Sequence, residues 1–483
     1  MSPIRSIAPA RALAPFAAAL VMGALVLFAP QLFKDGDSWW HLATGEWILQ
    51  HGRVPHADVF SYTRPGAPWV AHEWLSEVLM ALAWRAAGWS GVAVLFALAV
   101  AAAAWLLVRR LSLAIGGVTL LVVSVLAFAC MGGSLLARPQ LLVLPVLVLW
   151  TCELLAAREQ DRAPRLVAAL LMTLWANLHG SYVFGVLLAG AFGLEALVAH
   201  RLRPWPVLLR WGGFGLASLA AALVTPHGLA GLAYPFQVMT MSALPTIVEW
   251  RAADFSSPTA FEIALLVTLF VCLGRGVRIP AVRLLLLLGL LHMSLQHVRH
   301  QLVLAIVAPL ILAEPLAEAL GQPAAEPKRP RQSPALLALA GIAAAVLLAV
   351  RIALPVVRTD GINTPVTALA QVSPALRSQP VFNGYGFGGY LIFNGVKPFI
   401  DGRADMYGDA FTVAYDRAGS SAAGPLQRLL QRYQVAWTIL PPADPAVGLL
   451  DADAGWRRLH ADRYAVVHVR ATAPVKTPPT LSR

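Results

Sequence analysis

Charged residues are scarce in this sequence of 483 residues, where Asp, Glu, Lys and Arg together make up 13%. A soluble globular domain carries about 25%, so the composition excludes a chain surrounded by water. Three cysteines, Cys130, Cys152 and Cys272, lie in or beside apolar runs, and their spacing fits neither a metal site nor a disulfide framework. The chain has no phosphate-binding P-loop, which argues against nucleotide-driven transport, and neither a Gly-x-Ser-x-Gly elbow nor a His-Glu-x-x-His motif.

Long apolar runs take the place of charge, and 58% of the residues are hydrophobic. A run of about 20 apolar residues is long enough to cross a bilayer as a helix. The sequence predicts about eleven membrane-spanning helices, near 12–30, 89–108, 113–130, 139–157, 165–178, 181–199, 208–224, 259–274, 282–296, 301–319 and 335–356. The first run is taken as an uncleaved span, with a signal peptide as the alternative.

The net charge of +12 does not indicate nucleic acid, because the arginines form no stripe and sit in short gaps between apolar runs. Five of these gaps fall on one side of the predicted membrane, which the positive-inside bias identifies as the cytoplasm. They contain Arg109 and Arg110; Arg158, Arg162 and Arg165; Arg201, Arg203 and Arg210; Arg275 and Arg278; and Lys328, Arg329 and Arg331.

The opposite side receives acids, histidines and isolated arginines, which suit chemistry better than a solvating fringe does. Two outward loops, 31–88 and 225–257, belong to this side. The set consists of Asp35, Asp37, His72, Glu73, Arg138, Asn177, His179, His227, Glu249, Arg251, Asp254, His297, Arg299 and His300. Because the sides were assigned from the basic loops alone, this segregation predicts an outward-facing active site in the inner membrane of a bacterium.

The sequence divides into a membrane part, residues 1–356, and a tail, residues 357–483, that is polar enough to fold in water. The span count places the tail in the periplasm and the linker 321–334 in the cytoplasm. The tail is predicted to be a small α/β domain with strands at 380–382, 390–393, 398–400, 435–440 and 464–469 and a helix near 426–433. The fold class is therefore a helical polytopic membrane protein with a small α/β domain.

Two carboxylates follow the first span directly in the segment Lys34-Asp35-Gly36-Asp37-Ser38-Trp39-Trp40. Asp35 and Asp37 can hold a hard cation such as Mg²⁺ or Mn²⁺, or one can act as a general base. The alternative for Asp37 is an N-cap, because a helical stretch follows. Glu73, where the loop returns to the membrane, is a second acidic candidate, and its alternative is a place in the first turn of a helix.

Asp37, the aromatic-rich stretch ending in Gln50-His51-Gly52, and then Pro55 and Asp58 resemble the first outward loop of GT-C glycosyltransferases. This superfamily includes oligosaccharyltransferase catalytic subunits, protein O-mannosyltransferases and aminoarabinose transferases. The resemblance implies a catalytic carboxylate at Asp37, with Asp35 second, often in contact with a metal ion. It also implies a sugar donor built on a polyprenyl phosphate or diphosphate. The sequence departs from the family in lacking an obvious second Asp-Glu pair.

Polar residues at the outer ends of later spans are candidates for binding the donor phosphate. Arginine offers bidentate contacts to phosphate, and an ionisable group near hydrocarbon usually faces a cavity or a partner. The alternative is snorkelling of single side chains at the interface. The candidates are Arg138, His179, His227, His297, Arg299 and His300.

In the tail, Tyr385-Gly386-Phe387-Gly388-Gly389-Tyr390 is faintly similar to the aromatic-glycine acceptor motif of oligosaccharyltransferases, and Phe399-Ile400-Asp401-Gly402-Arg403-Ala404-Asp405 follows it. These motifs give acceptor-binding candidates at Tyr385, Tyr390, Asp401, Arg403 and Asp405. The alternative for the second motif is a structural Asp–Arg pair in a turn.

These features predict an inverting transferase that moves a sugar from a polyprenyl-linked donor, held in membrane lipid, to an acceptor at the outer face. The sequence leaves open a transporter or flippase for a lipid-linked saccharide. Transporters more often show internal repeats and charges near the bilayer midplane, and here neither is found. A non-catalytic membrane assembly protein is the third interpretation.

Overall fold

A computed structural model describes residues 7–202, 204–242, 244, 248–322, 334–419 and 423–471. The basic residues Arg203, Lys328, Arg329 and Arg331, and most of the predicted linker 321–334, lie outside these ranges. The chain forms two compact units. Unit 1 comprises Met1–Leu32 and Ala71–Val356, and unit 2 comprises Phe33–Val70 and Val357–Arg483.

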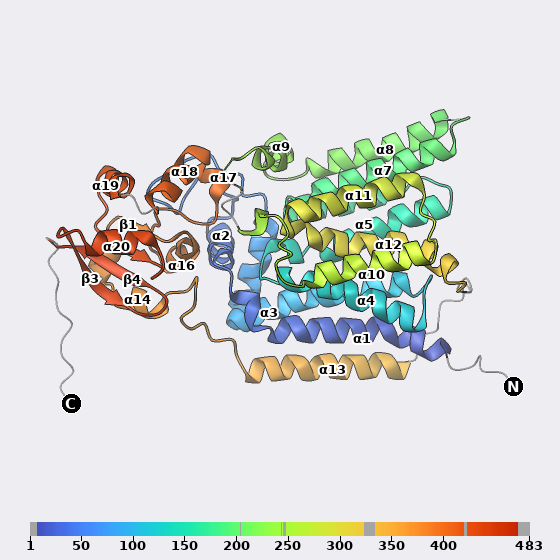
Figure 1. The fold of residues 1–483 in the computed structure, drawn as a ribbon, viewed down its shortest axis with the longest axis horizontal. Helices are drawn as coiled ribbons and strands as arrows, with labels where there is room; N and C mark the ends of the chain where they lie inside the picture. The colour runs from blue at the N-terminus through green and yellow to red at the C-terminus, as the bar shows by residue number, and fades with distance from the viewer. Residues whose placement is uncertain are drawn as a thin grey trace. The chain divides into compact units, whose positions relative to one another are not determined.

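Unit 1 is a helical bundle (Figure 1). Many large apolar side chains point outward, for example Leu98 at 65% exposure and Phe270 at 79%, as expected for helices surrounded by lipid. The helices are α1 (Ile7–Phe28), α3 (Trp74–Leu111), α4 (Gly117–Met131), α5 (Leu144–Glu159), α6 (Ala169–Leu178), α7 (Tyr182–Ala199), α8 (Pro204–Ala222), α9 (Gly228–Met239), α10 (Ala260–Gly274), α11 (Ala281–Gln296), α12 (Gln301–Ala319) and α13 (Pro334–Ala353).

Each predicted span overlaps one of these helices. Among the described residues, six helical segments are long and apolar enough to cross a membrane: Trp74–Leu111, Gly117–Ser134, Pro139–Glu159, Tyr182–Ala199, Val298–Ala319 and Pro334–Ala353. Four shorter apolar helices, Leu13–Phe28, Leu166–Leu178, Ala260–Gly274 and Ala281–Gln296, cover four more of the predicted spans. The protein is therefore a multi-pass membrane protein.

Helix α3 is interrupted at Ala87 and Gly88, whose backbone angles are not helical. Gly88 has a φ of +57°, which favours glycine because other residues would strain there. The break separates the amphipathic start of α3 from the apolar stretch that was predicted to span from residue 89.

Four of the basic residues predicted to be cytoplasmic form ion pairs with glutamates of unit 1, and Arg283, which was not in that set, joins them. Arg158 and Arg283 both contact Glu195, with nitrogen–oxygen distances of 3.4 and 2.9 Å. Arg110 pairs with Glu159, and Arg162 and Arg165 pair with Glu153. Arg110 lies in the last turn of α3 whereas Glu73 is its N-cap residue, so one member of each predicted set stands at each end of this helix.

Unit 2 joins a segment from early in the chain to the tail. Its first helix, α2 (Asp37–His51), packs against α16 (Gly388–Phe393). The other helices are α14 (Val366–Ala370), α15 (Pro374–Arg377), α17 (Ala404–Tyr407), α18 (Asp409–Ala418), α19 (Ala423–Arg432) and α20 (Pro445–Asp451). The sequence-based division had assigned loop 31–88 to the membrane part, whereas Phe33–Val70 cluster with the tail.

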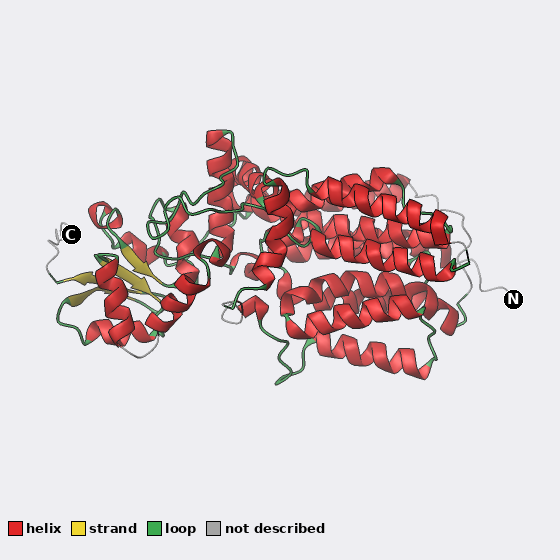
Figure 2. Cartoon of the chain, turned by 90° about the horizontal axis from the view of Figure 1, so that it is seen from above, coloured by secondary structure: helices red, strands yellow, loops and turns green. Residues whose placement is uncertain are grey.

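The four strands of the described residues form one sheet, yellow in Figure 2. The strand order is β1-β2-β4-β3. They are β1 (Val381–Asn383), β2 (Trp437–Leu440), β3 (Trp456–Ala461) and β4 (Val466–Arg470). β1 and β2 are parallel, and the other two pairings are antiparallel. The predicted strands at 380–382, 435–440 and 464–469 correspond to β1, β2 and β4, whereas β3 was missed.

Two other strand predictions were wrong. Residues 390–393 belong to α16, because Gly388 and Gly389 let this helix approach other backbone: a Cβ at Gly389 would lie 2.3 Å from the Gly36 oxygen. Residues 398–400 run without a ladder, because the Asn383 side chain bonds them instead. Its Oδ1 accepts from the Phe399 amide at 2.8 Å and its Nδ2 donates to the Ile400 oxygen at 2.9 Å.

Candidate functional site

Glu73 and two histidines form the first polar cluster of unit 1. Glu73 precedes α3 as its N-cap residue without a capping hydrogen bond from its side chain. Its Oε1 lies 3.2 Å from Nε2 of His179 and 3.6 Å from Nε2 of His72. Asn177, at the end of α6, accepts a 2.7 Å bond from the Trp74 indole and donates to two backbone oxygens. The ends of α3 and α6 are thereby held together around the carboxylate.

The ring of His179 is neutral in this arrangement. Its Nδ1 accepts a 3.0 Å hydrogen bond from the Ser181 amide, so the ring proton is assigned to Nε2, which faces Glu73. Burial, followed by the charges of Arg299, His72 and Arg138, holds the pKa of His179 well below its usual value. Glu73 opposes this shift, but protonating Nδ1 would place a proton against the Ser181 N–H.

Lowering the pH from 7 to 5.5 should therefore destabilise the protein through His179. The unfolded chain takes up a proton near pH 6.5 that the folded protein does not bind, so this stability is present above about pH 6.5 and lost as the pH falls toward the folded pKa. The loss is about 1.4 kcal/mol per pH unit for one proton. Thermal unfolding of wild type and His179→Gln, whose amide donates to Glu73 without titrating, measures it. Equal pH slopes for the two proteins would contradict the assignment.

Two arginines and one glutamate form the second polar cluster of unit 1. Arg138, before α5, bonds Oε2 of Glu249, and Arg299, between α11 and α12, bonds Oε1 of the same carboxylate at 3.2 Å. The Arg299 guanidinium also lies 4.4 Å from the ring centre of Trp250. Because Arg138 and Arg299 both lower the pKa of His179, the two clusters lie within electrostatic reach of each other.

Of the three remaining histidine candidates, two lie near Trp250 and the third is a helix N-cap. His297 bonds the Trp250 oxygen through Nδ1 at 2.7 Å. The His300 ring packs edge-on to the His297 ring, with 5.4 Å between ring centres. His227 is the N-cap of α9. From α9, Tyr234 contacts the first cluster: its ring lies tilted against His72, with 4.0 Å between ring centres. No motif in the sequence distinguished Tyr234, and Glu249 was noted only as one of many outer-side residues.

In unit 2, Asp37 is the first residue of α2, and the N-cap is Gly36. The N-cap alternative for Asp37 is thus wrong. Its Oδ1 accepts a 3.0 Å hydrogen bond from the Trp40 indole, and its amide donates to Asp35 at 3.3 Å. Gly402 packs against this carboxylate so closely that a Cβ there would lie 1.9 Å from Asp37 Oδ1. The first acidic motif and the Asp401-Gly402-Arg403 motif of the tail are therefore neighbours.

A buried ion cluster fixes the loop that carries Gly402. Arg403, at 1% exposure, bonds Asp401 through Nε and Nη2, both at 2.7 Å, and Asp58 through Nη1 at 2.8 Å. Its guanidinium lies 4.7 Å from the ring centre of Trp69. The Tyr407 hydroxyl donates to Asp401 at 2.7 Å. Burial, then the negative charge of Asp401, raises the pKa of Tyr407 well above its usual range.

This cluster corrects the predicted acceptor role of Asp401 and Arg403. Both side chains are buried and satisfy each other, so they hold a turn and do not face a ligand, as the alternative interpretation had it. Tyr390 is also buried, with its ring edge-on to Trp39 at 5.0 Å. Tyr385 lies in a short 3-10 helix, and Asp405 lies in the first turn of α17.

Comparisons with known proteins identify the architecture. No protein-family model and no curated protein matches the chain. Among solved structures the chain is similar to ArnT from Cupriavidus metallidurans, a GT-C protein whose crystal structure was determined with undecaprenyl phosphate bound. The two share 13% sequence identity and a TM-score of 0.50 over 95% of this chain and 98% of ArnT. The chain has a GT-C fold.

The predicted fold class is thereby confirmed, and within the GT-C fold the predicted residues sort by unit. Unit 1 brings together Glu73, Arg138, His179, Arg299 and the histidines beside Trp250. Unit 2 places Asp35 and Asp37 beside the Asp401-Gly402-Arg403 turn. Within the part of the chain that the structure describes, no group of three or more His, Cys, Asp or Glu side chains is placed to hold a metal ion.

Proposed function

We propose that this GT-C protein transfers a sugar from a polyprenyl-phosphate-type donor to an acceptor at the outer face of the bacterial cytoplasmic membrane, with unit 2 in the periplasm. The observation that carries the proposal is the pair of guanidiniums, Arg138 and Arg299, held on one carboxylate next to a Trp ring and a neutral histidine. Undecaprenyl phosphate bound to ArnT, a protein of the same fold, supports a polyprenyl lipid as the donor's carrier.

The arginine pair suits a phosphate for a physical reason. A guanidinium presents five N–H donors in a planar fork that matches the oxygens of a phosphate, and here the forks of two arginines meet at one carboxylate. Glu249 offsets only one of the two positive charges, which leaves the cluster net positive. As the sugar leaves, negative charge develops on the lipid phosphate, and preoriented donors stabilise that charge.

Asp37 is proposed as the carboxylate that removes a proton from the acceptor's attacking group. The Trp40 indole orients one oxygen of Asp37, and the packed turn at Gly402 limits its movement. Such ordering keeps a general base in its reactive position. Two further carboxylates are proposed to offset positive charge during the reaction. Asp35 accepts from the Asp37 amide, and Glu73 is held by two histidines.

A divalent cation is part of the proposal. Asp35 and Asp37 are two carboxylates only two residues apart, which matches the way Mg²⁺ is held by one or two carboxylates together with substrate phosphates. When bound, the cation would supply positive charge for phosphate oxygens. Sugar transfer should then fall on treatment with EDTA and return on addition of Mg²⁺ or Mn²⁺, whereas full activity in EDTA would remove the cation from the proposal.

Replacing Arg138 or Arg299 by Gln should weaken binding of undecaprenyl phosphate. Each change removes charge-assisted hydrogen bonds that are worth about 1.5–3 kcal/mol, so an affinity loss of about tenfold or more is expected for each. The measurement is titration of the purified full chain in detergent with undecaprenyl phosphate. Arg162→Gln is the matched control, since Arg162 pairs with Glu153 among the basic residues of the opposite helix ends.

Two outcomes would overturn the proposal. One is wild-type affinity for undecaprenyl phosphate in both arginine variants. The other is movement of a labelled polyprenyl-linked saccharide across proteoliposome membranes without any sugar transfer, which would favour a flippase.

A further inference from the structure

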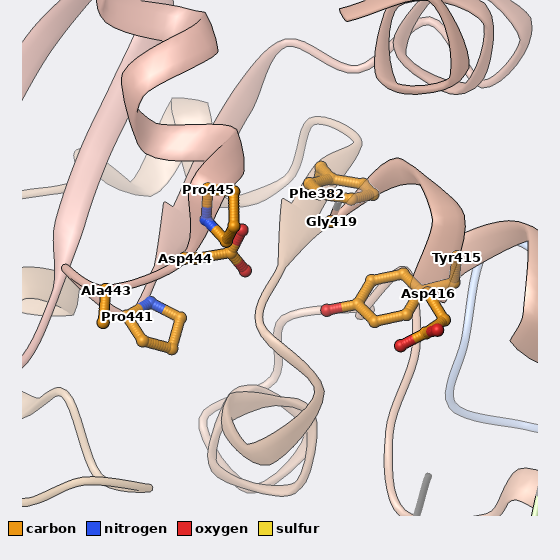
Figure 3. Close-up of a pocket in the computed structure, with 8 residues that line it drawn as sticks. All are labelled: Phe382, Tyr415, Asp416, Gly419, Pro441, Ala443, Asp444 and Pro445. Carbon is orange, nitrogen blue, oxygen red and sulfur yellow. The ribbon is translucent and has the colours of Figure 1, made fainter. Parts of the chain in front are cut away.

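Unit 2 contains a cavity of about 370 Å³ that none of the roles above uses. Its wall includes Phe382, Tyr415, Asp416, Pro441, Asp444 and Pro445 (Figure 3). This volume falls within the range of about 300–1,000 Å³ that is usual for small-molecule sites. The cavity lies wholly within one unit, so its shape follows from the packing of the sheet and of two helices, α18 and α20.

The cavity lies at the carboxyl ends of the two parallel strands. Phe382 is on β1 near its end, and Pro441 follows the last residue of β2. Side chains after β2 form one wall, and Tyr415 and Asp416 of α18 form the other. Ligands of open α/β sheets bind outside the carboxyl ends of parallel strands.

An aromatic ring and carboxylates face this space together. The ring of Tyr415 is the aromatic surface of the wall, and the buried ring of Phe382, at 1% exposure, lies 5.4 Å from it and supports it. The Tyr415 hydroxyl is fixed by donating to the Asn383 oxygen at 3.0 Å. Tyr415 and Asp444 approach the opening from opposite sides (Figure 3). Aromatic rings accept the C–H face of a sugar ring, and ionised carboxylates accept hydrogen bonds from its hydroxyl groups.

The two carboxylates keep hydrogen-bonding capacity. Asp444 uses Oδ1 to accept a 2.9 Å bond from the Ala446 amide. Asp416 is exposed on α18, and the described part of the chain shows no hydrogen bond or ion pair of its carboxylate. Two negative charges on this wall favour hydroxyl or ammonium groups and repel phosphate or uronate groups.

We propose that this cavity binds one ring of a neutral or amino-bearing saccharide, as a subsite for the acceptor glycan. That the bound saccharide is the acceptor rests on the proposed function. That the cavity binds a saccharide rests on the cavity alone. The ring of Tyr415 contacts the apolar face, and Asp416 and Asp444 accept from hydroxyl or amino groups. The subsite therefore selects what receives the sugar and takes no part in donor binding.

The test is a titration of the full-length protein in detergent with three trisaccharides. Binding is measured by calorimetry or by saturation-transfer NMR. The probes are tri-glucosamine (cationic), tri-N-acetylglucosamine (neutral) and tri-galacturonate (anionic). Saturable binding of the cationic or neutral probe, weakened about tenfold or more in Asp416→Ala, is expected, since hydrogen bonds to a charged group are worth about 1.5–3 kcal/mol. Arg417→Ala, the next residue on the same helix and not part of the cavity wall, should bind as wild type does.

Three results would overturn the subsite: no saturable binding of the cationic or neutral probe, binding of tri-galacturonate alone, or binding that Asp416→Ala leaves unchanged. Asp37→Asn serves to separate this inference from the proposed function. That variant should lose transfer but bind the trisaccharide as wild type does. Wild-type protein that binds the trisaccharide through Asp416 but transfers no sugar would keep the saccharide site and reject the transferase.

Discussion

Asp37→Asn should lower the rate of sugar transfer by about 10²–10⁴-fold, the usual contribution of a general base. Asparagine has nearly the same shape, and its side-chain oxygen still accepts from the Trp40 indole, so the fold of α2 should not change. The measurement is conversion of polyprenyl-phosphate-linked sugar to free polyprenyl phosphate in membrane vesicles of the producing organism. Glu46→Gln, on the same helix, is the matched control.

A second variant reaches Asp37 without touching it. In Gly402→Ala the new methyl carbon would lie 1.9 Å from Asp37 Oδ1 and 2.8 Å from the Trp40 indole nitrogen, so one of the three groups must move. Overpacking of this kind costs about 1–3 kcal/mol, and transfer should fall with it. Near wild-type transfer in Asp37→Asn would contradict the assignment, whatever Gly402→Ala does.

Arg403→Met should cost unit 2 about 3–5 kcal/mol, because breaking a buried ion pair leaves an uncompensated charge. Here two carboxylates, Asp401 and Asp58, would remain in a site from which water is excluded. Thermal unfolding followed by tryptophan fluorescence is a suitable readout, since Trp69 packs on the guanidinium. Transfer should also fall, since the same turn carries Gly402.

The Arg403 prediction has an internal check and an external one. Adding Asp401→Asn to Arg403→Met removes one buried charge and should recover part of the lost stability. Arg458→Met breaks a pair of similar geometry with Asp451, but Arg458 is 49% exposed, and exposed pairs are worth about 1 kcal/mol or less. Equal losses at Arg403 and Arg458 would show that burial does not decide the energy.

The sequence predicted the segregation of polar residues because that information is local. Arg138 and Arg299 stand at span ends, and alternating spans bring alternate loops to the same end of a bundle. The charge rule and the hydropathy pattern therefore suffice to put them in one group. The shared partner Glu249 could not be predicted, since which side chain stands between two loops depends on helix packing.

The arrangement in unit 2 was not predictable in the same way. Asp58 and Arg403 are 345 residues apart, and no periodicity links them. The sequence did indicate the Asp401-Gly402-Arg403 turn, but the charged residues at a strand end were interpreted as ligand contacts. The glycine between them was the better signal, because only a residue without a Cβ tolerates the approach of Asp37.

The separation of Asp58 from Arg403 also has a consequence for synthesis of the protein. At about 5–20 residues per second, Asp58 leaves the ribosome on the order of 20 seconds to a minute before its partner does. During that interval the segment Phe33–Val70 lacks the part of the chain against which it packs. A nascent chain arrested before Arg403 would thus carry a half-finished unit in which the Asp58 carboxylate still lacks its guanidinium partner.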